Sequence, residues 1–147
     1  MQKTRTGAVQ TRLDDAEPRY WPIGSYGVIG DCRTAALIAP NGSIDWLCAP
    51  RFDSDAFFAS LIGYDEHGSW MFSPTVPVHE RRQRYRDNSL VLETDFVCEG
   101  GLVRVTDFMP IDSDGERCDI IRIVEGVEGD VPVEMVLNVR FGYGAYK

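Results

Sequence analysis

Residues 90–109 read LVLETDFVCEGGLVRVTDFM, and this stretch decides the fold. Apolar residues recur at alternate positions on both sides of a Gly-Gly pair, which is the period of two expected of β-strands. We expect the two halves to form an antiparallel hairpin with Cys98 opposite Val103. That register places these pairs on one face: Phe96 and Val105, Thr94 and Asp107, and Leu92 and Met109. The match in register favours a hairpin with one buried face.

Two more hairpins are expected on either side of it. Asn41-Gly42 separates residues 34–39 from residues 43–48, and Asn-Gly favours the positive φ angles of a two-residue type I′ turn. Downstream, residues 120–125 run into glycines, and alternation resumes over residues 131–141. We expect these two segments to pair as well, so that the second half of the chain forms a meander.

The predicted fold class is all-β, an antiparallel β-sandwich. Apolar residues on both faces of one strand, such as Val97 beside Phe96, indicate packed sheets rather than one sheet open to water. One short helix is expected near residues 54–62, where the apolar spacing becomes helical. Ser54 or Asp53 would cap its start, and Gly63 would end it.

Composition limits the function classes. The 147 residues are 44% hydrophobic and 26% charged, which suits one modest folded domain. We expect residues 1–19 to be a flexible leader and residues 20–147 to form the sandwich domain. The net charge of -8 disfavours nucleic acid and anionic membranes as partners. Without an apolar signal segment, and with four scattered cysteines that suggest free thiols, the chain is expected in the cytoplasm.

The sequence contains no recognisable catalytic or cofactor motif. His67 and His79 stand outside any nucleophile–base context, and the cysteines and histidines lack metal-ligand spacing. Glycines at every third position of residues 24–30 do not match a dinucleotide-binding loop and indicate a tight loop and short strand instead. We therefore expect no cofactor and no metal.

One basic run is present, formed by Arg81, Arg82, Arg84 and Arg86 around Tyr85. Such a run is compatible with a polyanion contact. Against the acidic net charge, a solvated strand face or a contact with acidic neighbours is the favoured interpretation.

Four carboxylates cluster near aromatic residues and Arg51, the residue types that hold sugars; they are Asp31, Asp45, Asp53 and Asp55, beside Trp21 and Trp46. Glycoside hydrolysis needs an acid and a base on opposite sides of the scissile bond. A structural role for these carboxylates is favoured over a catalytic one, because Asp45 lies in a predicted strand and Asp53 or Asp55 at a predicted helix cap.

Several long segments resemble one known family, the bacterial glycoside hydrolase family 15 proteins of the trehalase and glucoamylase-like type. The segments are residues 21–37 (WPIGSYGVIGDCRTAAL), 41–54 (NGSIDWLCAPRFDS), 84–96 (RYRDNSLVLETDF), 105–110 (VTDFMP) and 122–126 (RIVEG). The resemblance covers the chain from about Tyr20 to its end.

The resemblance implies the N-terminal part of a super-sandwich, which precedes an (α/α)₆ barrel. In the family, two barrel glutamates hydrolyse an α-glucosidic bond with inversion. The barrel is absent from these residues, so the sandwich is expected to be truncated before its last strands and to carry no catalytic residue. Trp46, Arg51, Phe52 and Asp53 are expected at the barrel's sugar-binding mouth or in interdomain packing.

Three hypotheses follow from the residues and the resemblance. In the first, the chain supports the barrel of a hydrolase that acts on trehalose, maltose-type ends or another α-glucoside. In the second, it is an autonomous carbohydrate-binding or protein-interaction module. In the third, which we do not expect, Asp45 and Asp53 make it a small complete enzyme. Exposed strand edges also predict self-association of the isolated chain.

Overall fold

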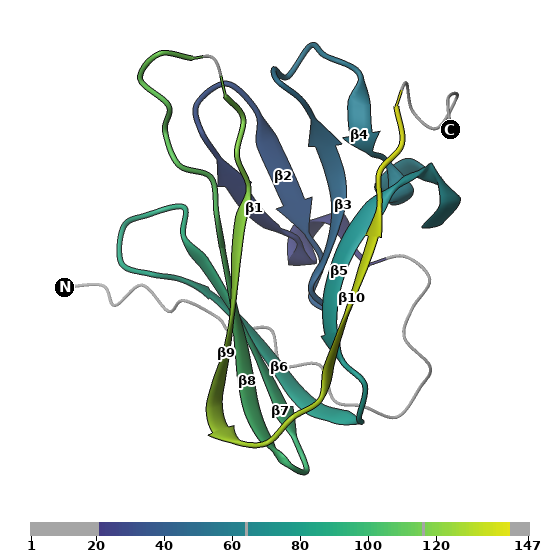
Figure 1. Ribbon diagram of the computed structural model, residues 1–147, viewed down its shortest axis with the longest axis vertical. Coiled ribbons are helices and arrows are strands. Elements are labelled where there is room, and N and C mark those ends of the chain that lie inside the picture. The colour runs from purple at the N-terminus through teal and green to yellow at the C-terminus, as the bar shows by residue number, and fades with distance from the viewer. Residues whose placement is uncertain (1–20, 64, 116, 142–147) are drawn as a thin grey trace, which may run out of the picture.

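The computed structural model describes residues 21–63, 65–115 and 117–141, in which two antiparallel sheets pack into a sandwich (Figure 1). The predicted all-β fold class is confirmed. The predicted leader, residues 1–19, lies outside the described residues. No helix in the described part of the chain is long and apolar enough to cross a membrane.

The first sheet has the strand order β1-β2-β3-β5-β10, with β4 paired to β3. Its strands are β1 (Gly27–Gly30), β2 (Ala35–Ile38), β3 (Ser43–Cys48), β4 (Ala56–Phe58), β5 (Ser69–Pro74) and β10 (Val133–Asn138). The second sheet has the order β6-β7-β8-β9. Its strands are β6 (Val78–Tyr85), β7 (Leu92–Cys98), β8 (Gly101–Phe108) and β9 (Ile121–Gly129). Three short 3₁₀ turns, η1 (Ile23–Ser25), η2 (Ser60–Ile62) and η3 (Asp65–His67), complete the elements.

The β7–β8 hairpin forms as predicted, but its register differs by two residues. Cys98 lies opposite Gly101, not Val103, and Phe96 lies opposite Val103. Only two residues connect the strands, whereas the predicted register left four in the turn. Because side chains alternate with a period of two, a shift of two keeps every residue on its expected face. The buried face was therefore predicted correctly even though its cross-strand partners were not.

Side chains from both sheets fill the space between them. One buried cluster joins Ile29, Ala36, Ile38, Ile44, Leu47 and Phe58 of the first sheet to Leu92 and Met109. A second buried cluster consists of Val78, Phe96, Cys98, Val103 and Val105, and Phe72 of the first sheet packs against it. Inward positions of β7 and β8 thus supply most of the core on one side, as their alternation requires.

The β2–β3 hairpin is confirmed, but its turn is not type I′. The N–H of Gly42 donates to the carbonyl of Ala39 at 2.9 Å, so Pro40 and Asn41 are the central residues. Only Gly42 has a positive φ, of 85°, which is the pattern of a turn followed by a glycine in the left-handed region. Pro40 accounts for the difference, because its ring restricts φ to values near those of the first central position.

The predicted helix near residues 54–62 is wrong. Residues 56–58 form β4, in which Phe58 lies opposite Leu47, and residues 60–62 form only the 3₁₀ turn η2. The N–H groups of Ala59 and Ser60 both donate to the carbonyl of Gly68. Pairing with neighbouring segments therefore replaces the hydrogen bonds of a helix, although Gly63 does end η2 as expected.

The predicted hairpin between residues 120–125 and 131–141 is also wrong. β9 pairs with β8, while β10 crosses to the other sheet and pairs with β5, with Met135 opposite Phe72 and Leu137 opposite Trp70. Residues 130–132 carry the chain from one sheet to the other (Figure 1). The two strands consequently form the last strand of each sheet on the same side of the sandwich.

A buried ion pair connects the two sheets through the core. Arg122 of β9 donates from Nε to Asp107 of β8 at 2.7 Å, and these side chains are 1% and 0% exposed. The same guanidinium donates to the carbonyls of Trp70 and Gly42, each at 2.6 Å, in the opposite sheet. Burial raises the pKa of Asp107, and Arg122 opposes that shift. Arg122 therefore ties β9 to β5 and to the β2–β3 turn.

Candidate functional site

Three loops come together at one end of the sandwich, which we call the loop end: residues 31–34, 49–55 and 117–120. Thr34 Oγ1 donates to the carbonyl of Cys48 at 2.5 Å, and the N–H of Phe52 donates to the carbonyl of Arg33 at 3.0 Å. Arg33 Nη1 reaches the carbonyl of Arg117 at 3.4 Å. Figure 1 shows these loops at its upper end. Their cross-links hold residues far apart in sequence at one surface.

Arg51, Phe52 and Asp53 lie at the tip of the loop between β3 and β4. Arg51 Nε donates to Asp53 Oδ1 at 3.0 Å, and the two side chains are 67% and 74% exposed. Phe52 is 65% exposed, although it is aromatic. An ion pair this exposed adds only about 0–1 kcal/mol to the stability of the fold. Stabilisation therefore does not explain why charged and aromatic residues stand at the tip of this loop. The three side chains are available for contact with another molecule or domain.

Trp46 has a different position from the other three predicted site residues. It lies in β3 opposite Leu37 and is half-buried against a small cluster of Cys48, Ala56 and Ala59. The structure thus brings Arg51 and Asp53 together and leaves Trp46 in the strand that leads to their loop. Its observed role is to pack against the residues that flank the loop.

An apolar cavity of about 390 Å³ opens beside the same loop. It is lined by Leu47, Ala49, Pro50, Phe57, Phe58, Trp70, Cys118, Ile120, Leu137 and Val139. Burial raises the pKa of Cys118, which keeps that thiol protonated. The lining contains no carboxylate or imidazole, so the cavity suits an apolar group and offers no acid–base chemistry.

Three of the four carboxylates considered as catalysts have local structural partners, including Asp53 with Arg51, and the fourth, Asp55, is exposed. Asp45 accepts hydrogen bonds from the hydroxyls of Tyr26 at 2.8 Å, Ser43 at 2.5 Å and Ser60 at 3.1 Å. Burial raises the pKa of Tyr26, and the bond to Asp45 adds to the shift. Asp31 accepts from the N–H groups of Arg33 and Thr34 and so shapes its own loop. These contacts support the structural interpretation.

No group of three or more potential metal ligands comes together among residues 21–63, 65–115 and 117–141. The cavity and the role of Arg33 in linking the three loops were not predicted from the sequence, because both depend on segments that are distant along the chain. The alternation of β10 and β5 was visible in the sequence, but their pairing was not. What the loop end offers chemically is an exposed aromatic, a charged pair and an adjacent apolar cavity.

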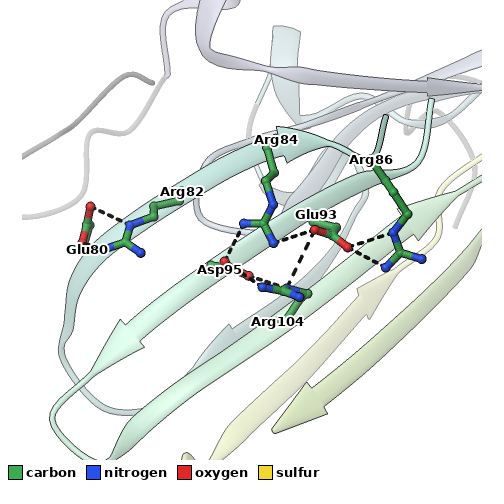
Figure 2. Close-up of polar contacts among 7 residues, drawn as sticks. All are labelled: Glu80, Arg82, Arg84, Arg86, Glu93, Asp95 and Arg104. Atoms are coloured by element: carbon green, nitrogen blue, oxygen red, sulfur yellow. Dashed lines mark hydrogen bonds and ion pairs between the residues drawn. The ribbon is translucent and has the colours of Figure 1, made fainter. Parts of the chain in front are cut away.

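Three arginines of the basic run, Arg82, Arg84 and Arg86, lie on the outer face of the second sheet, where acidic neighbours of the same chain pair with them (Figure 2). Arg81 lies opposite the buried Phe96 and so belongs to the other face of the sheet. Arg84 contacts Glu93 at 2.6 Å and Asp95 at 2.7 Å, Arg86 contacts Glu93 at 2.5 Å, and Arg104 contacts Asp95 at 2.7 Å. Arg82 pairs with Glu80. The favoured interpretation, contact with acidic neighbours, is confirmed for Arg82, Arg84 and Arg86.

These contacts change the titration of the carboxylates. A hydrogen bond from Arg86 lowers the pKa of Glu93 against the effect of burial, with Arg84 and Arg104 adding to the shift. Burial acts to raise the pKa of Asp95, but bonds from Arg104 and Arg84 outweigh it and leave the pKa below its ordinary value. A carboxyl with a lowered pKa stabilises the fold above its unfolded pKa, near 4, and loses that contribution as pH falls.

Asp95→Asn is therefore expected to lower the free energy of unfolding by about 1–2 kcal/mol at pH 7. Below pH ~4 the difference should shrink, because the wild-type carboxyl becomes protonated there. Urea unfolding at several pH values measures both effects. Asp53→Asn, at an exposed pair, is the matched control and should change little. Parallel pH profiles for Asp95→Asn and the wild type would contradict the assignment.

Comparison with known proteins gives consistent matches. A family model described as trehalase-like, N-terminal, matches residues 16–146. The trehalase of Thermoplasma volcanium is 36% identical over 133 residues, which cover 87% of this chain and 21% of that protein. The trehalase of Mycolicibacterium smegmatis is 31% identical over 140 residues, covering 83% and 21%. Trehalase 1 of Sulfolobus acidocaldarius is 35% identical over 121 residues, covering 82% and 20%.

The chain spans about a fifth of the length of these curated relatives. The comparison with solved structures gave no match. The residues that the family model matches include both sheets and the loop end. The chain therefore belongs to the trehalase-like N-terminal family.

Proposed function

We propose that this chain is the N-terminal sandwich of a family 15 glycoside hydrolase, and that it supports a catalytic (α/α)₆ barrel in the rest of the polypeptide. The observation that carries the proposal is the match of the trehalase-like N-terminal family model to residues 16–146. The similar relatives are named trehalase, and the chain spans about a fifth of their length. The substrate class is an α-glucoside, with trehalose as the first candidate. Catalysis belongs to the barrel.

The loop end is the surface that we assign to the barrel. Phe52 places an exposed aromatic ring there, and the Arg51–Asp53 pair places two exposed charges beside it. Trp46 packs behind this loop and holds its base. Such a surface suits either interdomain packing or the rim of a sugar-binding mouth, because aromatic and arginine side chains serve both.

We also propose that the protein acts in the cytoplasm. None of the four cysteines, Cys32, Cys48, Cys98 and Cys118, forms a disulfide in the described part of the chain. Free thiols are the usual state in a reducing compartment, whereas secreted domains of this size often carry disulfides.

The test is glucose release from trehalose and maltose by the 147-residue chain and by the full-length polypeptide of the same gene. We expect release by the full-length polypeptide alone, since Asp31, Asp45 and Asp53 of the short chain are held by structural partners. Release by the short chain would instead return Asp45, Asp53 and Asp55 as the candidate catalysts. If neither polypeptide releases glucose and the short chain binds a glucan or trehalose, the autonomous binding module is favoured.

Phe52→Ala in the full-length polypeptide separates the two roles of the loop end. At a substrate mouth, the substitution raises KM and leaves Tm unchanged. At an interdomain contact, it lowers Tm and leaves KM unchanged. The matched control is Ile62→Ala in η2, a side chain 68% exposed outside the loop end. No change in either quantity would remove Phe52 from the proposed surface.

A further inference from the structure

The loop between β1 and β2 has a backbone conformation that its residues do not favour on their own. The N–H of Asp31 donates to the carbonyl of Thr34 at 3.4 Å, so Cys32 and Arg33 are the two residues of a tight hairpin loop. Cys32 has a φ of 73°, in the left-handed region that glycine usually occupies at such a position. Its side chain is exposed, so side-chain packing does not hold the backbone there. Such a conformation persists only where surrounding contacts impose it, and it is frequent at functional sites.

Asp31 provides the contact that holds this loop. Its Oδ1 accepts from the N–H of Arg33 at 2.9 Å and from the N–H of Thr34 at 2.8 Å. Asp31 is 3% exposed, and the two bonds offset the cost of burying its carboxylate. Thr34 is fixed on its other side, because its hydroxyl donates to the carbonyl of Cys48. The carboxylate of Asp31 therefore determines the path of the chain through Cys32 and Arg33.

The same loop supports the exposed tip formed by residues 51–54. The N–H of Phe52 donates to the carbonyl of Arg33 at 3.0 Å. Within the tip, the N–H of Ser54 donates to the carbonyl of Arg51 at 3.1 Å, and the Ser54 hydroxyl accepts from the N–H of Arg51 at 3.2 Å. These bonds make the tip a closed turn, and the bond to Arg33 attaches that turn to the β1–β2 loop. Because Phe52 is 65% exposed, the position of its ring depends on these backbone contacts.

We infer that Asp31 is a positioning residue for the tip: its carboxylate holds Cys32 and Arg33 in the conformation that presents the Arg33 carbonyl to Phe52. The inference rests on the proposed function, which places the tip against the barrel or at its substrate mouth. Because Asp31 is buried within the domain, it acts on that contact through Arg33 and not directly. It determines where the ring of Phe52 stands.

Hydrogen–deuterium exchange at the amide of Phe52 tests this contact in the full-length polypeptide without an assay of activity. Asp31→Ala removes the acceptor of both loop N–H groups and should speed the exchange of Phe52 about tenfold. Asp31→Asn keeps an acceptor oxygen at the same place and should preserve the protection. The matched control is Asn41→Ala, which removes the acceptor of the Ser43 N–H beyond the opposite end of β2 and should leave Phe52 unchanged. Unchanged exchange in Asp31→Ala, or an equal loss of protection in Asp31→Asn, would overturn the inference.

Substitutions at Cys32 test the backbone conformation without altering a buried side chain. Cys32→Gly allows the positive φ and should keep the amide of Phe52 protected. Cys32→Val introduces a β-branched residue that disfavours positive φ, so it should speed the exchange of Phe52. Both variants lack the thiol, so its loss does not explain a difference between them. Equal exchange of Phe52 in the two variants would contradict the role given to the loop conformation.

A double-mutant cycle in the full-length polypeptide shows whether Asp31 acts through the tip. Asp31→Ala should change the same quantity as Phe52→Ala, which is KM at a substrate mouth or Tm at an interdomain contact. The double variant Asp31→Ala/Phe52→Ala should lose less than the sum of the two single variants, because both act on one contact. Strictly additive effects would make Asp31 an independent structural residue and refute the inference.

The conservative variant Asp31→Asn separates positioning from catalysis. It should retain the wild-type KM and kcat, since the amide oxygen still accepts both loop hydrogen bonds while an amide cannot act as an acid or a base. Loss of kcat in Asp31→Asn would assign a catalytic carboxyl and overturn the inference. If Phe52→Ala changes neither KM nor Tm while Asp31→Ala still speeds the exchange of Phe52, the proposed role of this surface fails and the positioning of the tip by Asp31 stands.

Discussion

Replacing Arg122 with Met is expected to lower the free energy of unfolding by about 3–5 kcal/mol, because it leaves the Asp107 carboxylate buried without a counter-charge. Asp107 is 0% exposed, and burial already raises its pKa while Arg122 is present. The substitution also removes the donors that reach the carbonyls of Trp70 and Gly42. Urea unfolding of the 147-residue chain, monitored by tryptophan fluorescence, measures the loss.

The double variant Arg122→Met/Asp107→Leu separates two effects on the free energy of unfolding, that of the unpaired buried carboxylate and that of lost packing. Removing both charges eliminates the unpaired carboxylate, so much of the stability should return. The loss in Arg122→Met alone should also shrink as pH falls, since a carboxyl with a raised pKa favours the folded state when it is protonated. Arg51→Met is the exposed control, with an expected change of about 0–1 kcal/mol. Equal losses for Arg122→Met and Arg51→Met would contradict the bridging role.

Phe96→Ala is expected to cost about 3–5 kcal/mol, through lost burial and the cavity left behind. Phe96 is 0% exposed and packs with Val78, Val103 and Val105. A Cβ added at Gly42 would lie 3.0 Å from Phe96 Cζ, which shows how tightly the β2–β3 turn covers the ring. Because the net stability of folded domains is only about 5–15 kcal/mol, a loss of this size is expected to weaken or remove the cooperative unfolding transition.

Phe52→Ala is the matched control in the same chain, because it removes the same ring from a side chain that is 65% exposed. We expect it to change the free energy of unfolding by no more than about 0.5 kcal/mol. Phe96→Leu keeps most of the apolar volume and should retain a measurable transition if Phe96→Ala does not fold. Similar effects of Phe96→Ala and Phe52→Ala would mean that the ring of Phe96 does not lie in the core.

The candidate site was only partly predictable. Arg51, Phe52 and Asp53 were identified from sequence, and the structure shows that they share an exposed loop and that Arg51 pairs with Asp53. Their function stays a prediction. The cavity beside them was not predicted, because its walls combine β3, β4, β5 and β10 with residues 118–120. No local pattern encodes an arrangement of segments so far apart in the chain.

The sequence by itself determined the fold class and the buried faces. Alternation over residues 92–98 and 101–108 specifies which side chains point inward, since that depends on a local period of two. Only the tertiary structure decided the cross-strand register, the conversion of residues 56–58 into a strand, and the crossing of β10 to β5. These outcomes depend on which distant segment supplies the hydrogen-bond partner, and strands accept any partner whose spacing fits. The Arg122–Asp107 bridge arises for the same reason, because it requires both sheets to be in place.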